Sequence, residues 1–413
     1  MRTLQLEDFY KYKFLSGLEY NKSGSLAAVI RAEPDVENNG YKKNLYLIDG
    51  DTVKPFITDG KVGGFIWEDD EHILFAANRS DAEKKRLESG DMFTAYYRIS
   101  VKGGEALPAF TLPFTALSIR KISDELFVAT GAVDVNYPDF YTYDADKRKE
   151  TAAKYKAEAD YEVIDENPWW FNGTGMINKK RYGLFVCNVK TGEVKMITTA
   201  NFRVGDYCEK DGVIYYAGEE YTEKMADVHF IYSYDTKTGR TRQLTKKPMS
   251  VSYMDWVDNM LVISGSYKET YGVSQSDCLY KLSFDGGEPE MFLYTEQGPG
   301  NSVGSDCRLG GNGRFATDGD KVYFVSTVVN AAHLICSDLS GKAETIIGVE
   351  GTVDGFDIKN GKIILVGMYD MKLQEVYTFD GKLHQVSHFN EDILKDTYVA
   401  KPNKMTIKSQ GYD

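Results

Sequence analysis

Short apolar runs separated by tight turns recur along the whole chain. The plainest copy joins the run 355–358 (GFDI), the turn 359–362 (KNGK) and the run 363–366 (IILV), then continues through 375–379 (EVYTF) and a second Gly turn. Asn-Gly and Asp-Gly supply the positive φ angles that tight hairpins need. Alternating or continuous apolar residues suit strands that are buried between neighbouring sheets. Each copy therefore predicts a meander of four antiparallel strands.

The copies repeat at a period of roughly 40–50 residues, which is typical of propeller blades. We predict an all-β fold, a seven-bladed β-propeller of four-stranded antiparallel blades with short helical insertions. The units are expected near residues 16–60, 61–111, 112–200, 201–247, 248–296, 297–348 and 349–389. The expected organisation is a lead-in segment at 1–15, the propeller at 16–398, and 399–413 as a linker and the first strand of a further domain.

Three segments depart from the strand pattern. Residues 80–90 (SDAEKKRLESG) and 144–160 (DADKRKETAAKYKAEAD) are charged and rich in helix formers, and both fall where the second and third strands of a unit should be joined. We expect helices there, either as solvated loop insertions or as contacts with a partner domain or a gate. Residues 389–399 (FNEDILKDTYV) predict a short helix after the last unit.

Composition narrows the class of protein. The formal net charge of −13 argues against general nucleic-acid binding, because an acidic chain repels phosphate backbones. No apolar stretch approaches the roughly 20 residues that span a bilayer, and the N-terminus lacks an apolar signal core, so we expect a cytoplasmic protein with no membrane contact. The five cysteines are scattered and never spaced as CxxC, which argues against disulfides and structural zinc. No cofactor is expected.

Three motifs that could carry chemistry are interpreted as structural. Residues 300–304 match G-x-S-x-G around Ser302, but no buried strand precedes them and no helix follows, as a nucleophile would require. His384 and His388 are four residues apart, a spacing that aligns metal ligands on a helix, yet they fall in a strand and turn. The glycines at 310–313 lack the Lys-Ser/Thr of a phosphate loop. We expect no catalytic residue and no metal site.

The chain resembles the prolyl oligopeptidase family of serine peptidases, in particular its acylaminoacyl-peptidase-like branch. The resemblance is carried by residues 6–15, similar to that family's lead-in helix, by 20–29 (YNKSGSLAAV), by 163–175 (VIDENPWWFNGTG), and by 404–412, which looks like the strand that begins its hydrolase domain. The resemblance implies an N-terminal propeller followed by a C-terminal α/β-hydrolase domain. The family's catalytic serine, aspartate and histidine all belong to that second domain.

Two pairs of residues are candidate substrate contacts. Glu219 and Glu220 follow an apolar strand, and dipeptidyl-peptidase relatives use paired propeller glutamates to hold a substrate's amino terminus; a solvated loop is the plainer interpretation. Trp169 and Trp170 are adjacent, so both cannot point into one sheet face. At least one is free to cover a domain interface or line a cavity, while core packing remains the alternative.

The leading hypothesis is a non-catalytic propeller that gates access and contributes to short-peptide selection in a serine peptidase. Its partners would be the α/β-hydrolase domain of the same polypeptide and short peptide substrates. One alternative is a free-standing propeller that binds proteins or a small ligand on its rim or in its channel. Another is a propeller enzyme, such as a lactonase or glycosidase, whose metal ligands or paired acids would meet in the channel.

Overall fold

The computed structural model describes residues 1–172 and 174–411. Gly173 and positions 412–413 lie outside the described residues, and with them the end of the segment expected to start a further domain. In the described part of the chain the strands pair into seven successive units of four antiparallel strands, taken in sequence order. A single parallel bridge between Ala332 and Thr352 joins the last two units into one larger sheet.

The strands of the first four units are β2 (Phe14–Tyr20), β3 (Ala27–Asp35), β4 (Gly40–Asp49) and β5 (Thr52–Ile57); β6 (Gly64–Trp67), β7 (His72–Ala76), β8 (Thr94–Ser100) and β9 (Leu107–Leu112); β10 (Ala116–Lys121), β11 (Leu126–Asp134), β14 (Lys180–Asn188) and β15 (Val194–Met196); and β16 (Phe202–Lys210), β17 (Val213–Glu220), β18 (Phe230–Asp235) and β19 (Thr241–Gln243).

Those of the last three are β20 (Ser250–Val257), β21 (Met260–Ser266), β22 (Cys278–Ser283) and β23 (Glu290–Leu293); β24 (Phe315–Asp318), β25 (Lys321–Val328), β26 (Ala331–Asp338) and β27 (Ala343–Ile347); and β28 (Thr352–Lys359), β29 (Lys362–Met368), β30 (Glu375–Phe379) and β31 (Leu383–Gln385). Outside the units lie β1 (Arg2–Thr3), β12 (Trp170–Phe171), β13 (Gly175–Met176), β32 (Thr397–Tyr398), the helices α1 (Asp81–Glu88) and α2 (Ala145–Ala157), and the 3-10 turns η1 (Leu6–Lys11), η2 (Phe140–Thr142) and η3 (Gly272–Ser274).

Tight turns between the first two strands of a unit follow the predicted chemistry. Asp211 and Gly212 both have positive φ, at 55° and 82°, and Asn360 and Gly361 repeat this with 52° and 75°. Two successive residues with positive φ form the type of hairpin whose twist matches that of the strands, and Asp-Gly or Asn-Gly adopts it most readily. The local sequence therefore sets the register of these hairpins.

Both faces of the second strand in each unit are buried. In β29, Ile363 and Leu365 pack toward the sixth unit, whereas Ile364 and Val366 pack toward the first. Because both faces of these strands are buried, their sequences are continuously apolar and do not alternate between apolar and polar residues. Seven apolar clusters among the described residues each combine side chains of two neighbouring units, and the seventh joins the last unit to the first. This closed ring is a β-propeller, as the repeat predicts.

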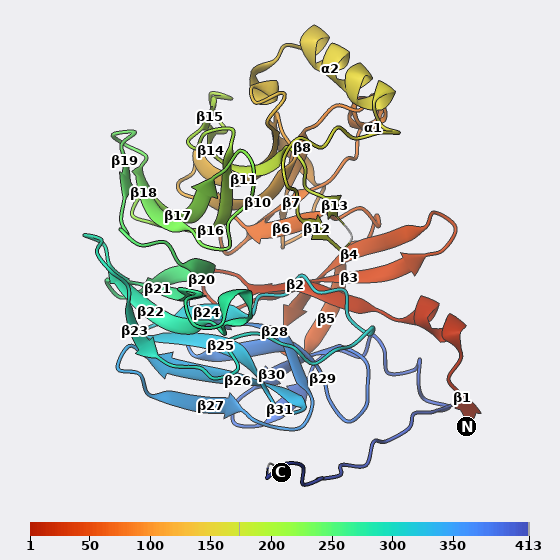
Figure 1. Ribbon diagram of the computed structural model, residues 1–413. Coiled ribbons are helices and arrows are strands. Elements are labelled where there is room, and N and C mark those ends of the chain that lie inside the picture. Colours follow the sequence, from red (N-terminus) through yellow and green to blue (C-terminus); the bar gives the residue numbers. More distant parts are fainter. Residues whose placement is uncertain (173, 412–413) are drawn as a thin grey trace.

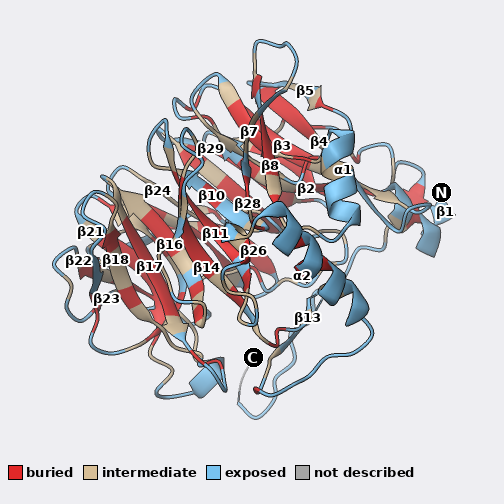
Figure 2. Ribbon diagram, turned by 90° about the horizontal axis from the view of Figure 1, so that it is seen from above, coloured by how far each residue is buried: buried red, intermediate tan, exposed pale blue. Residues whose placement is uncertain are grey.

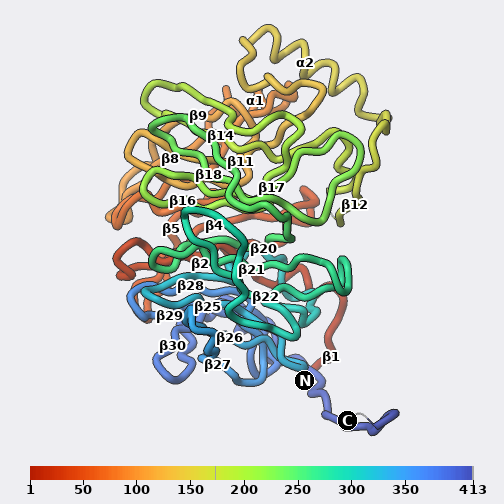
Figure 3. The backbone as a smooth tube through the Cα atoms, turned by 60° about the vertical axis from the view of Figure 1, so that its left-hand side comes forward, coloured from red at the N-terminus to blue at the C-terminus, as the bar shows by residue number. Residues whose placement is uncertain are grey.

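The ring closes between β2 and β28–β29 without a strand shared between the first and last units. Figures 1 and 3 both show the red N-terminal strands beside the blue C-terminal ones. The N–H of Tyr20 donates to Asp357 Oδ2 at 2.7 Å, and the N–H of Leu15 donates to Gln374 Oε1 at 3.0 Å. Apolar contacts of Leu15 with Val366 and Val376 complete the seam.

A buried acid, Asp354, binds two of the side chains that form or adjoin this seam. Asp354 has a side chain only 1% exposed; it accepts hydrogen bonds from Arg308 Nη1 at 2.7 Å and from Gln374 Nε2 at 2.7 Å. Gln374 therefore connects Asp354 to the Leu15 N–H of the first unit. Arg308 comes from the long connection between β23 and β24, so one carboxylate fixes that connection, the last unit and the first unit together.

One end of the ring carries the longer connections. Because strands alternate in direction, the loops between second and third strands all emerge at the same end; we call this end the loop face. It bears α1 between β7 and β8, and α2 with the β12–β13 hairpin between β11 and β14. Figures 1 and 2 show both helices on this side of the molecule. The predicted helical insertions are thus confirmed, and they form part of one surface.

Helix α2 is fixed to the ring, not loosely attached. Arg148 is buried, forms an ion pair with Asp91 at 2.7 Å, and donates to the carbonyls of Met92, Pro113 and Phe140. These bonds join the helix to the connections of the second and third units. The segment is therefore a built element of the loop face.

The helix predicted at 389–399 is wrong: these residues form turns, and Thr397–Tyr398 instead pairs in parallel with Arg2–Thr3. The carboxylate of Glu375 accepts the N–H groups of Phe389 at 2.9 Å and Asn390 at 2.6 Å, which holds the start of this segment against the last unit. At the N-terminus, the expected lead-in helix is reduced to the 3-10 turn Leu6–Lys11. Residues 400–408 form no helix or strand.

Replacing Asp354 by alanine should destabilise the ring by about 3 kcal/mol or more, because Arg308 loses its buried partner and Gln374 its acceptor. Urea unfolding measures the loss. The matched control Asp51→Ala removes an exposed carboxylate from a hairpin turn and should change the unfolding free energy by less than about 0.5 kcal/mol. Equal effects of the two substitutions would contradict the role given to Asp354.

Candidate functional site

Glu219 and Glu220 lie at the end of β17 on the loop face, and their side chains point to opposite sides of the strand. Successive residues of a strand point to opposite sides. Glu219 is half-buried and its Oε1 accepts the Ala226 N–H at 2.7 Å, whereas Glu220 is exposed and its Oε1 accepts from Thr199 Oγ1 at 3.0 Å. The two carboxylates therefore face different surroundings: Glu219 contacts the loop that follows β17, and Glu220 contacts the connection between the third and fourth units.

Burial raises the pKa of Glu219 to about 7, although the Ala226 N–H opposes the shift; Asp227 adds to it, and Arg203 and Arg181 act against it. In the described part of the chain no basic group lies within ion-pair distance of Glu219. The carboxyl is thus close to half-ionised near neutral pH. A ligand ammonium at this position would favour its ionised form.

The side chains of Trp169 and Trp170 point in different directions, as expected for neighbouring residues of an extended segment. Trp169 is half-buried and packs against Ile177, Tyr221 and Met225, while Trp170 is 67% exposed in β12. Trp169 packs between the insertion and the loop that follows β17, and Trp170 presents an aromatic surface to solvent.

A buried ion pair that the sequence analysis did not predict holds the insertion between β11 and β14 in place. Arg181 and Glu166 have side chains 0% and 1% exposed, with Arg181 Nη2 at 2.8 Å from Glu166 Oε2. The guanidinium also lies 3.6 Å from the Tyr221 ring centroid and donates to the Tyr221 carbonyl. Although burial acts to raise it, hydrogen bonds from Arg181 and the Lys179 N–H hold the pKa of Glu166 below its usual range.

The sequence did contain a signal for Arg181. Along β14, Arg181 lies on the same buried side of the strand as Gly183, Phe185 and Cys187. A charged residue at such a position needs a buried partner of opposite charge. Its partner lies on the irregular insertion, so no strand periodicity could have identified Glu166.

Arg203 is a second basic group of this site. Its guanidinium lies 4.3 Å from the ring centroid of Tyr182 and 5.9 Å from that of Phe171. Burial, followed by the positive charge of Arg203, lowers the pKa of His229 to about 4, so this histidine is neutral at pH 7. Arg203 stands opposite Glu219 in the β16–β17 pairing. The site therefore combines one acid of raised pKa with a guanidinium held by aromatic rings.

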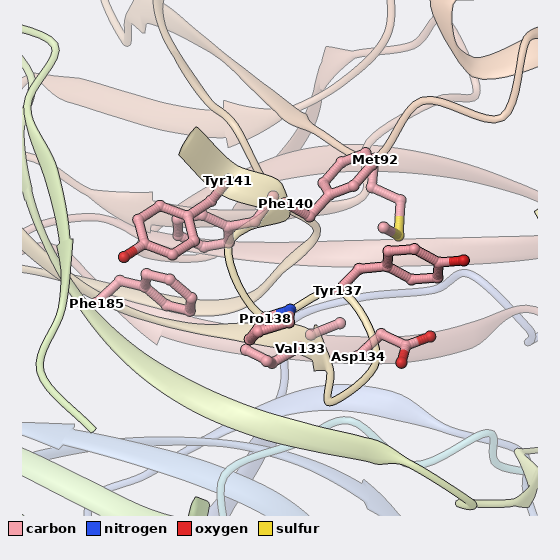
Figure 4. A pocket seen from close by; sticks show the side chains of 10 residues that line it. Met92, Val133, Asp134, Tyr137, Pro138, Phe140, Tyr141 and Phe185 are labelled. Carbon is pink, nitrogen blue, oxygen red and sulfur yellow. The ribbon is translucent and has the colours of Figure 1, made fainter. Parts of the chain in front are cut away.

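Two cavities lie beside these residues. The smaller, shown in Figure 4, is an aromatic crevice of about 10 Å³ whose wall includes Tyr141, Phe185 and Met92, room for one water molecule at most. The larger, of about 330 Å³, opens between β11, β14, α2 and the β12–β13 hairpin. Met92, Val133 and Asp134 line both.

The G-x-S-x-G segment forms an irregular connection between the fifth and sixth units. The Ser302 N–H donates to Thr327 Oγ1 at 2.7 Å, and the neighbouring Asn301 is buried and donates to the Val353 carbonyl. The residues on either side of Ser302 provide no strand-turn-helix. His384 and His388 contact Asp380 and Glu391, respectively.

A carboxyl whose pKa is raised in the folded chain stabilises the fold less as it ionises. The stability linked to Glu219 is therefore complete below its ordinary value of 4.5 and is lost as the pH rises through about 7. Glu219→Gln keeps the acceptor for the Ala226 N–H and removes the titration. Thermal unfolding should show the melting temperature of the variant rising relative to that of the wild type between pH 4.5 and pH 8. A difference that stays constant over this range would contradict the assignment.

Solved structures of three peptidases, or of parts of them, have the same fold. An acylaminoacyl peptidase from Pyrococcus horikoshii matches with a TM-score of 0.72 at 18% identity, over 97% of this chain and 56% of that one. The β-propeller domain of the Trilobed protease from Pyrococcus furiosus gives 0.60 at 16% identity, over 92% and 98%. A puromycin-hydrolysing peptidase of Mycobacterium tuberculosis gives 0.59 at 10% identity, over 94% and 56%.

This chain therefore spans little more than half the length of the two whole peptidases. No family model and no curated protein matches it. No helix among the described residues has the length and apolar character to cross a membrane. The chain has the β-propeller fold found in acylaminoacyl peptidases and related peptidases.

Proposed function

We propose that this chain is the propeller domain of a serine peptidase, acting with an α/β-hydrolase domain of the same polypeptide to admit and select short peptides. The observation that carries the proposal is the likeness to the acylaminoacyl peptidase over 97% of this chain. In this proposal residues 16–398 are the propeller and 399–413 lead into the hydrolase domain. The propeller supplies no catalytic group.

The loop face is the docking surface in this proposal. Large apolar side chains are exposed on loops of the third, fifth, sixth and seventh units, all at this end of the ring. They include Val163, Trp170, Tyr271, Val273, Val329 and Met371. Exposed apolar residues gathered on one surface favour a protein interface. A hydrolase domain covering this face would bury them and enclose Glu219 and the two tryptophans.

Glu219 would hold the amino terminus of a peptide substrate. It is a half-buried carboxylate without an ion-pair partner in the described residues, so an ammonium would find a low-dielectric acceptor there. Trp169 and Trp170 would contact apolar side chains of the peptide. Glu220 contributes negative charge from the other side of β17. Selection for short substrates then follows from enclosure between the ring and the hydrolase domain.

The test begins with the transcript that encodes this chain. We expect the reading frame to continue for roughly 250 residues, one large domain, with a strand-flanked G-x-S-x-G followed by Asp and His. In that full-length protein, Glu219→Gln should lower kcat/KM about tenfold for peptides with a free amino terminus and leave N-acetylated peptides unaffected. Arg240→Gln, on an exposed turn at the opposite end of the ring, is the control.

A stop codon directly after residue 413 would contradict the peptidase role and favour the free-standing binding module. A fluorophosphonate probe should leave this chain unlabelled; labelling at Ser302 would also contradict the proposal. Equal loss of activity toward free and acetylated peptides would remove Glu219 from substrate recognition while leaving the peptidase assignment intact.

A further inference from the structure

The cavity between β11, β14, α2 and the β12–β13 hairpin has the form of a small-molecule site. Its volume of about 330 Å³ lies within the range of ligand pockets. Apolar and aromatic side chains line it from separate elements. Among them, Met92 precedes β8, Val133 belongs to β11, Tyr155 to α2, and Ile177 follows β13. Because α2 is fixed by Arg148 and the hairpin segment by the Arg181–Glu166 pair, the walls are built into the fold.

Positive charge predominates on the polar wall. Lys180, Arg181 and Arg203 line the cavity together with a single acid, Asp134. Asp134 already accepts hydrogen bonds from Tyr155 Oη at 3.1 Å and from the Asn136 N–H at 2.8 Å. Arg181 is neutralised by Glu166, whereas neither Lys180 nor Arg203 forms an ion pair within the described residues. The wall therefore carries two cations that have no ion-pair partner among the described residues.

Donors on this wall also lack acceptors. Arg203 Nη1 and Arg181 Nε are both buried, and neither has a hydrogen-bond partner among the described residues. Buried guanidinium N–H groups are costly to leave unpaired. Cation–π contacts with Tyr182 and Phe171 hold the Arg203 guanidinium beside the cavity. A guanidinium held in this way is preorganised for a carboxylate.

We propose that this cavity binds a small carboxylate with an apolar body, whose carboxylate lies against Arg203 and Lys180 and whose body fills the space between Met92, Val133 and Ile177. An amine would be repelled by the same wall, and a neutral molecule would leave the two cations unpaired. Glu219 stands opposite Arg203 in the β16–β17 pairing but is not among the residues that line this cavity, and the proposal stands whether or not the peptidase role holds.

The depth of the site limits the size of the body. Beyond Met92 and Val133 the crevice of Figure 4 is filled by Phe140, Tyr141 and Phe185, which leave about 10 Å³. A single aromatic ring on a short alkyl chain matches this depth. 4-Phenylbutyrate is therefore a suitable probe, with 4-phenylbutyramide as its neutral analogue and 4-phenylbutylamine as its cationic one.

Isothermal titration calorimetry with the chain should show binding of 4-phenylbutyrate, at least tenfold weaker binding of the amide and none of the amine. Arg203→Gln should weaken the carboxylate about tenfold or more, and the exposed Lys180→Gln about threefold, whereas Arg240→Gln on the opposite end of the ring should leave it unchanged. If Arg203→Gln impairs folding, the Lys180→Gln variant alone tests whether the positive wall binds the carboxylate.

A steric variant tests the location. Ala132 lines the cavity and is exposed there, so Ala132→Phe should fill the space and abolish binding while the melting temperature stays close to that of the wild type. Equal affinities for carboxylate and amide, undiminished binding by both charge variants, or binding that survives in Ala132→Phe would each overturn the proposal.

Discussion

A ring of sheets depends on the contact between its first and last members. Here that contact uses no shared strand: the Tyr20 N–H donates to Asp357, the Leu15 N–H donates to Gln374, and apolar side chains of both units interlock behind them. The seam between the fourth and fifth units has the same kind of hydrogen bond, since the Met254 N–H donates to Asp206 at 2.7 Å. Closure is thus one more copy of the contact between neighbours. Each unit buries its second strand only if units stand on both sides, so loss of the closing seam would expose apolar faces at two edges.

The packing of neighbouring units in the ring determines how residues of the loop face are placed relative to one another. Glu219 and Arg203 belong to the fourth unit, while Arg181 and Tyr182 belong to the third. The angle between these two units therefore sets their separation. The Arg181–Glu166 pair then attaches the insertion of the third unit across the junction by its contact with Tyr221. A buried charge pair of this kind is costly to form and still more costly to break, so it serves position more than stability.

Much of the fold could be predicted from local pattern. Turn dipeptides and two-sided apolar strands are local features, and the predicted unit ranges contain the observed strands to within a few residues. The helix expected at 389–399 is absent because contacts distant in sequence hold both ends of the segment: Glu375 accepts the N–H groups of Phe389 and Asn390, and Thr397–Tyr398 pairs with Arg2–Thr3. The candidate site was only partly predictable. The position of Glu219 on the loop face follows from its strand, but its partners depend on how two units and one insertion pack together. Arg203 carried no local signal, because its stacking rings come from β14 and β12.

Native-state hydrogen exchange measures the closing seam directly. The amides of Tyr20 and Met254 are matched, since each donates to an aspartate of the preceding unit around the ring. If closure is equivalent to an interior seam, the two amides should show protection factors that agree within about tenfold and should exchange through the same global opening. Exchange at Tyr20 more than about a hundredfold faster than at Met254 would mean that the ring opens between its first and last units, and would contradict the account.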